Sequence, residues 1–370
     1  MKVSTNDQQV TTKGKKLSKT ADIMIGNTSR RKVSGGGSWM GKGQVKASYE
    51  DAIPVNDVYS KLLDWAPLEV PNANLIPVTL DDQFDTIVNG QAYQVLVRDD
   101  HKAIVRSDNH ESLGVFTNSY DSSAYNRMVG FIQDVFQGAL PVWNAGLLAG
   151  GRKFFITVGM DETMHDTKSG LDFWPYLMFH SSLDGSLANT FVPGTGVAQC
   201  DNMFRSMRKA ANGAGRLVKF KRSRHSLNDV RIKSIRDALG IMTLEAEQFG
   251  DDLHQLVDTP LPSQLFYKAL DIIIPEPKND PSKAAVTRWE NQWNNLVDLY
   301  TGSPMVEPWK DTAFGFVQMI NTYNNRYKAV RGALQVERTF ERALSGSLAE
   351  ADGAAIRALE TVLDRQLLTV

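Results

Sequence analysis

Residues 153–192 contain three short runs rich in β-branched and aromatic residues: KFFITV at 153–158, FWPYLMFH at 173–180 and LANTFV at 187–192. Runs of this length and composition favour strands. Asp184-Gly185 lies between the second and third runs and is a strong signal for a tight hairpin turn. We expect a helix from about 197 to 212 to follow. The order strand, strand, strand, helix predicts an α+β fold with an antiparallel sheet and a β-β-β-α core.

The rest of the chain adds further strands and many helices. Strands are expected at 92–97, 103–106 and 113–116, with a polar turn at 99–101 between the first two. Apolar spacing predicts helices at 49–65 and 121–137. From residue 226 the chain is predicted to be mainly helical, with prolines at the breaks: 226–257, 263–273, 281–300, 309–344 and 353–367.

Composition and length indicate three regions. The chain has 370 residues, 42% hydrophobic and 22% charged, which is ordinary for a globular protein. The predicted regions are a basic flexible arm (1–48), an α+β nucleic-acid-binding core (49–250) and a helical C-terminal region (251–370). No apolar run approaches the roughly 20 residues of a membrane helix, and the start lacks the apolar stretch of a signal peptide. The single cysteine, Cys200, excludes an intrachain disulfide. We expect a cytoplasmic protein.

Charge is strongly segregated along the chain. Residues 204–236 carry eleven Lys and Arg against one acid, Asp229, and residues 1–48 carry ten against two acids. The formal net charge is only −1, so these regions, at +10 and +8, leave −19 on the remainder. Segregation of this kind costs self-repulsion, which a polyanionic partner relieves. A solvated helix face would intersperse Glu with Lys, and this segment does not.

The basic segment therefore supplies the candidate DNA contacts. Alternation in Val218-Lys219-Phe220-Lys221 would place Lys219 and Lys221 on one face of an extended segment, which suits a polyphosphate groove. Nearby aromatic residues at 143, 154, 155, 173, 174, 176 and 179 are expected to be mostly core, with one or two available to stack on unpaired bases. The predicted DNA-binding residues are Arg152, Lys153, Arg205, Arg208, Lys209, Arg216, Lys219, Phe220, Lys221, Arg222 and Arg224.

Catalytic motifs are weak by comparison. The Gly-rich stretch at 36–43 resembles a phosphate-binding loop, but Gly43 stands where the magnesium-binding hydroxyl belongs and no apolar strand precedes it. Acids and histidines at 99–111 match no defined metal signature, and a solvated turn explains them better than a metal-dependent nuclease does. Cys200 is expected to be buried and inert. The sequence thus indicates a protein that is not an enzyme and needs no cofactor.

Several motifs resemble those of a phage/plasmid-like protein family built around a domain of unknown function. They are AGLLAGGRKFF at 145–155, PYL at 175–177, SSLDGS at 181–186, LGV at 113–115 with Tyr120, and LDW at 63–65. The resemblance covers roughly residues 38–250. The family's Cys-x-Asn-Thr motif is retained at Cys200 and Asn202, whereas Met203 replaces the threonine.

The β-β-β-α order with a basic groove is also similar, more distantly, to phage single-strand annealing proteins of the RecT, Erf and Red-beta types. That resemblance implies a phage protein that binds and anneals single-stranded DNA for homologous recombination without ATP. It also implies a homo-oligomer, as a ring or filament, in the cytoplasm of an infected bacterial host, with a phage exonuclease as a further partner. The alternative is a non-enzymatic interaction protein whose basic segment docks an acidic protein.

Overall fold

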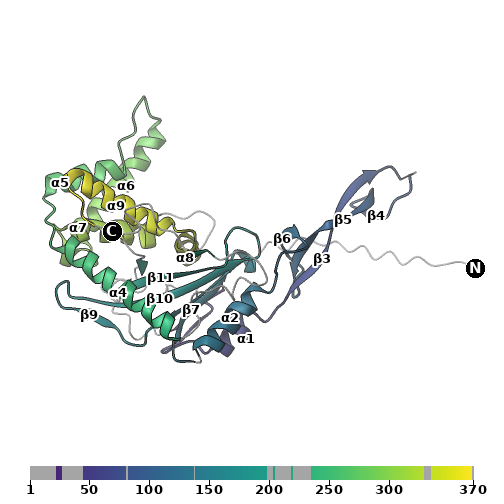
Figure 1. The fold of residues 1–370 in the computed structure, drawn as a ribbon. Coiled ribbons are helices and arrows are strands. Elements are labelled where there is room, and N and C mark those ends of the chain that lie inside the picture. The colour runs from purple at the N-terminus through teal and green to yellow at the C-terminus, as the bar shows by residue number, and fades with distance from the viewer. Residues whose placement is uncertain are drawn as a thin grey trace, which may run out of the picture.

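The computed structural model describes residues 22–26, 45–80, 82–136, 138–197, 203–204, 218–219, 235–328 and 335–368. Its main sheet has the order β12-β11-β10-β8-β7-β1-β2, with β13 also on β11 and β9 also on β10 (Figure 1). Pairing is antiparallel except between β1 and β2, which are parallel. The strands are β1 (Asp22–Ile25), β2 (Ala47–Ser48), β7 (Val142–Leu148), β8 (Lys153–Gly159), β9 (Met164–Asp166), β10 (Leu171–Ser182), β11 (Thr190–Val197), β12 (Met203–Phe204) and β13 (Val218–Lys219).

The three strands predicted at the centre of the sequence are confirmed as β8, β10 and β11. β10 pairs with β8 on one side and with β11 on the other, and the Asp184-Gly185 turn joins β10 to β11. Both faces of β8 are covered, which explains its continuous apolar run. Phe154 and Ile156 belong to the core on one face of the sheet, while Phe155 belongs to the core on the other.

The helix predicted from about 197 to 212 is wrong where the structure describes it. Met203–Phe204 forms β12, which pairs with the outer edge of β11. The first helix after β11 in the described residues is α4 (Ile235–Val257), which contacts β10 and β11. The free edge of β11 offers backbone groups that β12 satisfies, and this tertiary pairing overrides the local helical pattern.

The flexible-arm prediction for residues 1–48 is also wrong at its described residues. Ile23, Met24 and Ile25 of β1 are almost fully buried between β7 and β2. A three-residue apolar run inside a polar stretch is too short to identify from the sequence, and it is stabilised by pairing with strands distant in the chain.

A second sheet forms an arm that extends from the body (Figure 1). It contains β3 (Pro67–Val78), β4 (Thr86–Val88), β5 (Gln91–Arg106) and β6 (Ser112–Thr117), in the order β3-β5-β4 with β6 also on β5. The turn predicted at 99–101 is wrong, because β5 continues through it. The β3 register jumps there from Pro71↔Lys102 to Asn72↔Arg98. The polar residues therefore form a bulge.

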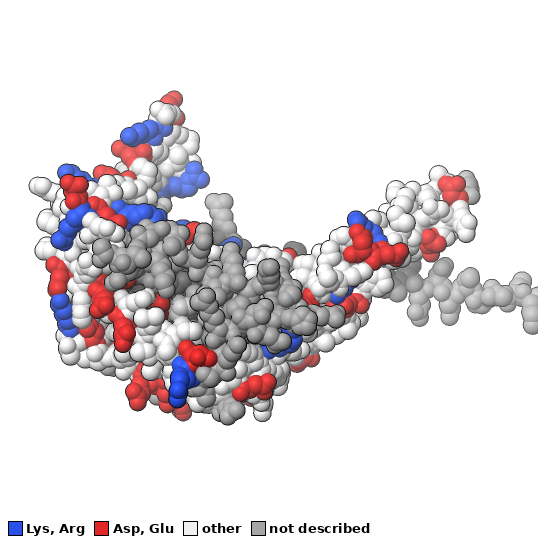
Figure 2. Space-filling view, viewed as in Figure 1, with Lys and Arg blue, Asp and Glu red and all other residues white. Residues whose placement is uncertain are grey.

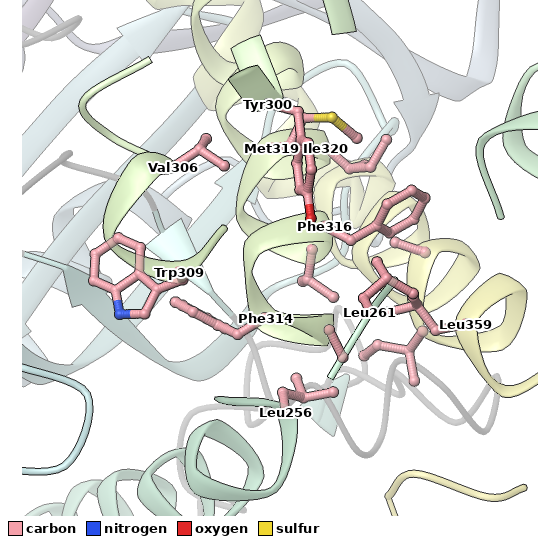
Figure 3. Packing of buried hydrophobic residues seen from close by; sticks show 14 of the residues in the cluster. Leu256, Leu261, Tyr300, Val306, Trp309, Phe314, Phe316, Met319, Ile320 and Leu359 are labelled. Carbon is pink, nitrogen blue, oxygen red and sulfur yellow. The ribbon is translucent and has the colours of Figure 1, made fainter. Parts of the chain in front are cut away.

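Helices cover both faces of the main sheet. α1 (Val55–Leu62) and α2 (Ala124–Phe136) share a core with one face, and α8 (Gln335–Ser345) packs on the other. The remaining helices form a bundle with its own large core, which also includes Leu171, Phe173 and Val197 of the sheet (Figure 3). They are α5 (Ser263–Ile273), α6 (Lys283–Gly302), α7 (Ala313–Thr322) and α9 (Ser347–Leu363), with the short turn η4 (Glu307–Trp309) and the π-helical η5 (Tyr323–Tyr327). A further short turn, η3 (Ala149–Gly151), joins β7 to β8 in the main sheet.

The α+β class and the helical C-terminal region are thus confirmed. The boundary predicted at residue 250 falls inside α4. Within the described residues, no helix is both long and apolar enough to cross a membrane.

Candidate nucleic-acid interface

The outer edge of β11 holds both ends of the first half of the basic segment. Phe204 of β12 pairs with Thr195, and Val218 of β13 pairs with Phe191. The two pairing positions are four residues apart on β11, a separation of roughly 13 Å at about 3.3 Å per residue. Arg205, Arg208, Lys209 and Arg216 fall between these two paired strands in the sequence.

Nine of the eleven predicted DNA contacts belong to the basic segment, residues 204–236. Lys219 is placed by its backbone in β13, opposite Thr190. The backbone is extended at 218–219. The other members of the basic segment lie outside the described residues: Arg205, Arg208, Lys209, Arg216, Phe220, Lys221, Arg222 and Arg224. Cys200 and Asn202 also lie outside them.

Arg152 and Lys153, at the start of β8, are the two predicted contacts with described side chains. Arg152 lies 3.4 Å from Oε1 of Glu111 and donates to the Ser112 carbonyl at 3.1 Å. Lys153 Nζ lies 3.3 Å from Oε1 of Glu341 on α8. Both cations are thus already paired with carboxylates, and a phosphate would have to compete with these partners. This geometry indicates that Arg152 and Lys153 connect the start of β8 to residues 111–112 and to α8.

The aromatic residues of the central strands are buried. Trp143, Phe154, Phe155, Phe173, Trp174, Tyr176 and Phe179 are all at most 6% exposed. Their interpretation as core is confirmed, and the idea that one or two of them stack on bases is wrong. Both faces of the sheet are covered by helices, so strand aromatics on either face pack internally.

The acids at 99–111 are held in local ion pairs. Asp100 accepts from Arg98 and His101, and these hydrogen bonds hold its pKa below the ordinary value. Asp108 accepts from Arg106, which likewise lowers the Asp108 pKa. Among the described residues, no group of three or more His, Cys, Asp or Glu is placed to hold a metal ion.

The motifs of the family resemblance converge at the base of the arm. Tyr125 of α2 donates from its hydroxyl to the carbonyl oxygens of Gly151 (3.1 Å) and Arg152 (2.7 Å), and accepts from the Leu183 amide at 3.1 Å. Tyr120 donates to the Ser182 carbonyl at 2.6 Å. The glycine-rich motif, the hairpin motif and α2 are therefore joined by hydrogen bonds between tyrosine hydroxyls and backbone groups.

Arg106 completes this junction. Its guanidinium lies 4.1 Å from the centre of the Trp65 ring and donates to the Gly150 carbonyl at 3.1 Å. Gly151 has φ +95°, and a Cβ there would approach Arg106 Nη1 to 2.6 Å. Only glycine allows both the left-handed backbone and this close approach. The charged and catalytic residue types in the sequence did not predict this junction. The motifs shared with the family were the sequence signal that could have located it.

Comparison with known proteins places most of this junction, but not Trp65 and Arg106, inside one family domain. No curated protein and no solved structure matches the chain. A family model described as a domain of unknown function (DUF932) matches residues 112–345. The match begins at the first residue of β6 and ends at the last residue of α8, so it contains the central strands and the basic segment but not β3, β4 or β5. The chain therefore belongs to the DUF932 family.

Proposed function

We propose that this protein binds single-stranded DNA along the β11 edge of its main sheet and anneals complementary strands without a nucleotide cofactor. In this proposal it acts in phage homologous recombination, in the cytoplasm of an infected host. The observation that carries the proposal is a double pairing: within the basic segment 204–236, which has eleven cations and one acid, both Phe204 and Val218 pair with the edge of β11.

The two pairings would bring a highly charged segment to one edge of the sheet. Arg205, Arg208, Lys209 and Arg216 lie between the two paired strands in the sequence, so a polyanion bound at this edge would meet closely spaced cations. β13 then continues into Phe220, Lys221, Arg222 and Arg224. Each phosphate neutralised by such cations releases condensed counterions, and this release drives binding without sequence preference.

Two features favour binding of single strands over duplex DNA: the extended backbone at 218–219 and the aromatic residue Phe220. Alternation in the sequence would place Lys219 and Lys221 on one side of an extended segment, and that spacing would suit a flexible phosphate backbone better than a rigid duplex. Since the aromatics of the central strands are buried, Phe220 is the one aromatic among the proposed contacts that remains to stack on a base. Annealing follows when phosphate neutralisation lowers the repulsion between two complementary strands.

The test is fluorescence anisotropy of labelled single-stranded DNA and matched duplex DNA across several salt concentrations. The variant Lys219→Gln, Lys221→Gln, Arg222→Gln should weaken single-strand binding at least tenfold at low salt. It should also lower the salt slope by about 2, because each phosphate that is no longer neutralised removes about 0.7 from the slope. The matched control is Lys268→Gln, Lys278→Gln, Lys283→Gln, which removes three exposed cations from the helical region. This control should bind like the wild type.

The binding and stability results distinguish DNA binding from docking of an acidic protein and from a structural role of the cations. Salt-sensitive, single-strand-preferring binding with unchanged thermal stability of the first variant supports the proposal, and a complementary-strand assay then measures annealing. Absence of binding by the wild-type protein at low salt contradicts it and leaves docking of an acidic protein partner as the explanation of the basic segment. Equal loss of binding and stability in the variant would show that these cations are structural.

A further inference from the structure

One face of the outer arm carries three consecutive β3–β5 pairs that are mostly apolar. Residues opposite each other in an antiparallel pair project to the same side, so the register assigns each pair to a face. Three successive pairs share one side: Ala73↔Val97, Leu75↔Val95 and Pro77↔Tyr93. Leu75 is 47% exposed, Val95 38% and Val97 50%. No helix of the described chain covers this side.

The opposite face of the arm is mixed in polarity. Three of its pairs, Asn72↔Arg98, Asn74↔Leu96 and Ile76↔Gln94, each contain at least one polar side chain, whereas Val78↔Ala92 nearer the tip is apolar. A narrow ribbon exposed to water on both sides is marginal in stability, and a contiguous exposed apolar surface on a folded protein usually marks an interaction site. The difference between the two faces therefore indicates that a partner covers the apolar face.

The edge of the arm does not suit a partner strand. β3 contains Pro67, Pro71 and Pro77, which have no backbone N–H to donate across a free edge. Prolines on an edge strand hinder addition of a further strand. A partner is accordingly expected to pack on the face of the arm.

The charge of the arm indicates what kind of surface a partner would present to it. No Lys or Arg occurs from residue 62 to residue 97, whereas Asp82 and Asp85 lie at the tip. Asp82 accepts from the Thr79 hydroxyl at 2.6 Å and from its amide, and Asp85 accepts from the Val95 amide at 2.7 Å. Figure 2 shows acidic and uncharged residues on the outer part of the arm. The complementary surface is apolar and positively charged.

The other end of the same molecule carries such a surface. A groove of about 400 Å³ between α5, α6, α7 and α9 is lined by Ile272, Ile274, Ile320, Ala351 and Ala354, with the exposed cations Lys328 and Arg357 beside them. Lys328 and Arg342 both donate to Asn324, at 3.3 and 2.7 Å, which brings two positive charges together. Burial first, and then Arg342, lower the pKa of Lys328, so a neighbouring anion would relieve this repulsion.

We propose that the apolar face of the arm docks on this helical groove of a second copy of the chain, with the acidic tip beside Lys328 and Arg357. The arm and the groove lie at opposite ends of the molecule (Figure 1). A contact between two different surfaces is head-to-tail, so repetition generates a ring or a filament. This inference concerns protein–protein contact and stands without DNA.

The test measures molar mass by light scattering and sedimentation on nuclease-treated protein without DNA. The wild type should form species larger than a monomer, and association should weaken with salt. Val95→Asp with Val97→Asp should be monomeric, with at least a tenfold decrease in association constant. The matched control is Leu96→Asp, between them on the opposite face and 54% exposed, which should assemble like the wild type. Circular dichroism should show equal folding of all three.

A mixing experiment tests the groove. Lys328→Glu with Ala354→Glu should also be monomeric, because it removes a cation and places a charge in the groove. Mixed with the arm variant, it should form heterodimers, since its intact arm meets the intact groove of the other chain. A monomeric wild type, or equal assembly of the arm and Leu96→Asp variants, would overturn the proposal. A mixture that stays monomeric would overturn the head-to-tail contact.

Discussion

At the scale of single residues, the buried carboxyl group of Asp352 gives the clearest dependence on pH. Asp352 is 2% exposed, and the Asn321 side-chain amide donates to both of its oxygens at 3.0 Å. Burial raises the Asp352 pKa from 3.8 to about 7, and the hydrogen bonds from Asn321 oppose part of this rise. The folded state therefore binds this proton more tightly than the unfolded state does.

The sign of the effect on stability follows from that difference. The contribution of Asp352 to the free energy of unfolding is fully present below pH 4 and is lost as pH rises through about 7. Urea unfolding between pH 4 and 8 should show a decline in the free energy of unfolding of at most about 4 kcal/mol from this group. Asp352→Asn should flatten that decline, whereas Asp298→Asn, at an exposed position of α6, should leave it in place. An unchanged profile in Asp352→Asn would contradict the assignment.

Gly151 provides a second prediction at this scale, because a closely matched glycine exists. Gly151→Ala should lower the free energy of unfolding by about 3 kcal/mol or more, since it combines left-handed backbone strain with a clash against Arg106 and Trp65. Gly170→Ala has φ +70° but open space around the added Cβ, so it should cost only about 1–2 kcal/mol. Chemical denaturation of both variants measures the difference. Equal costs would show that the contact with Arg106 is unimportant.

At the scale of elements, the described residues break the helix predicted over 309–344 at two places. Thr312 caps α7: its hydroxyl accepts from the Gly315 amide at 3.1 Å and donates to the Trp309 carbonyl. After Thr322 the chain widens into the π-helical η5, where Asn325 donates to Asn321 at 2.6 Å. Buried polar side chains thus reshape a segment whose apolar spacing alone indicates one continuous helix.

The cap of α7 can be tested with an isosteric change. Thr312→Val should lower the free energy of unfolding by about 1–2 kcal/mol, because it removes both hydrogen bonds at the start of a helix with a buried core. Thr301→Val is the control, since the Thr301 hydroxyl donates back to the Val297 and Asp298 carbonyls of its own helix on the exposed side of α6. It should change stability by less than about 0.5 kcal/mol. Thermal unfolding monitored by circular dichroism compares the two variants, and similar shifts would argue against the cap.

At the scale of the whole molecule, charge and apolar surface are distributed over separate places. The basic segment is tethered at the β11 edge, the acidic arm extends from one end and the helical groove lies at the other (Figure 1). Binding of DNA and assembly of copies would therefore use different surfaces. Raising salt should weaken both, but the arm variant should lose assembly while keeping its basic segment, and the Lys219, Lys221 and Arg222 variant should do the reverse.

The sequence by itself determined the elements whose signals are local. The β8, β10 and β11 strands, the Asp184-Gly185 turn, α2 and α5 were predictable because composition and periodicity act within a few residues. The charge segregation was equally plain, since it needs no folding to be counted. The motifs around Gly151 and the hairpin supported the family relationship without any knowledge of the contacts between them.

Only the tertiary structure decided the rest. β1 is buried because β7 and β2 pair with it, and β12 replaces an expected helix because the edge of β11 is available. β5 passes through an expected turn because β3 pairs on both sides of the bulge. The central aromatics became core rather than base contacts because helices cover both faces of the sheet. In each case a partner distant in the chain supplies hydrogen bonds or burial that outweigh local propensity.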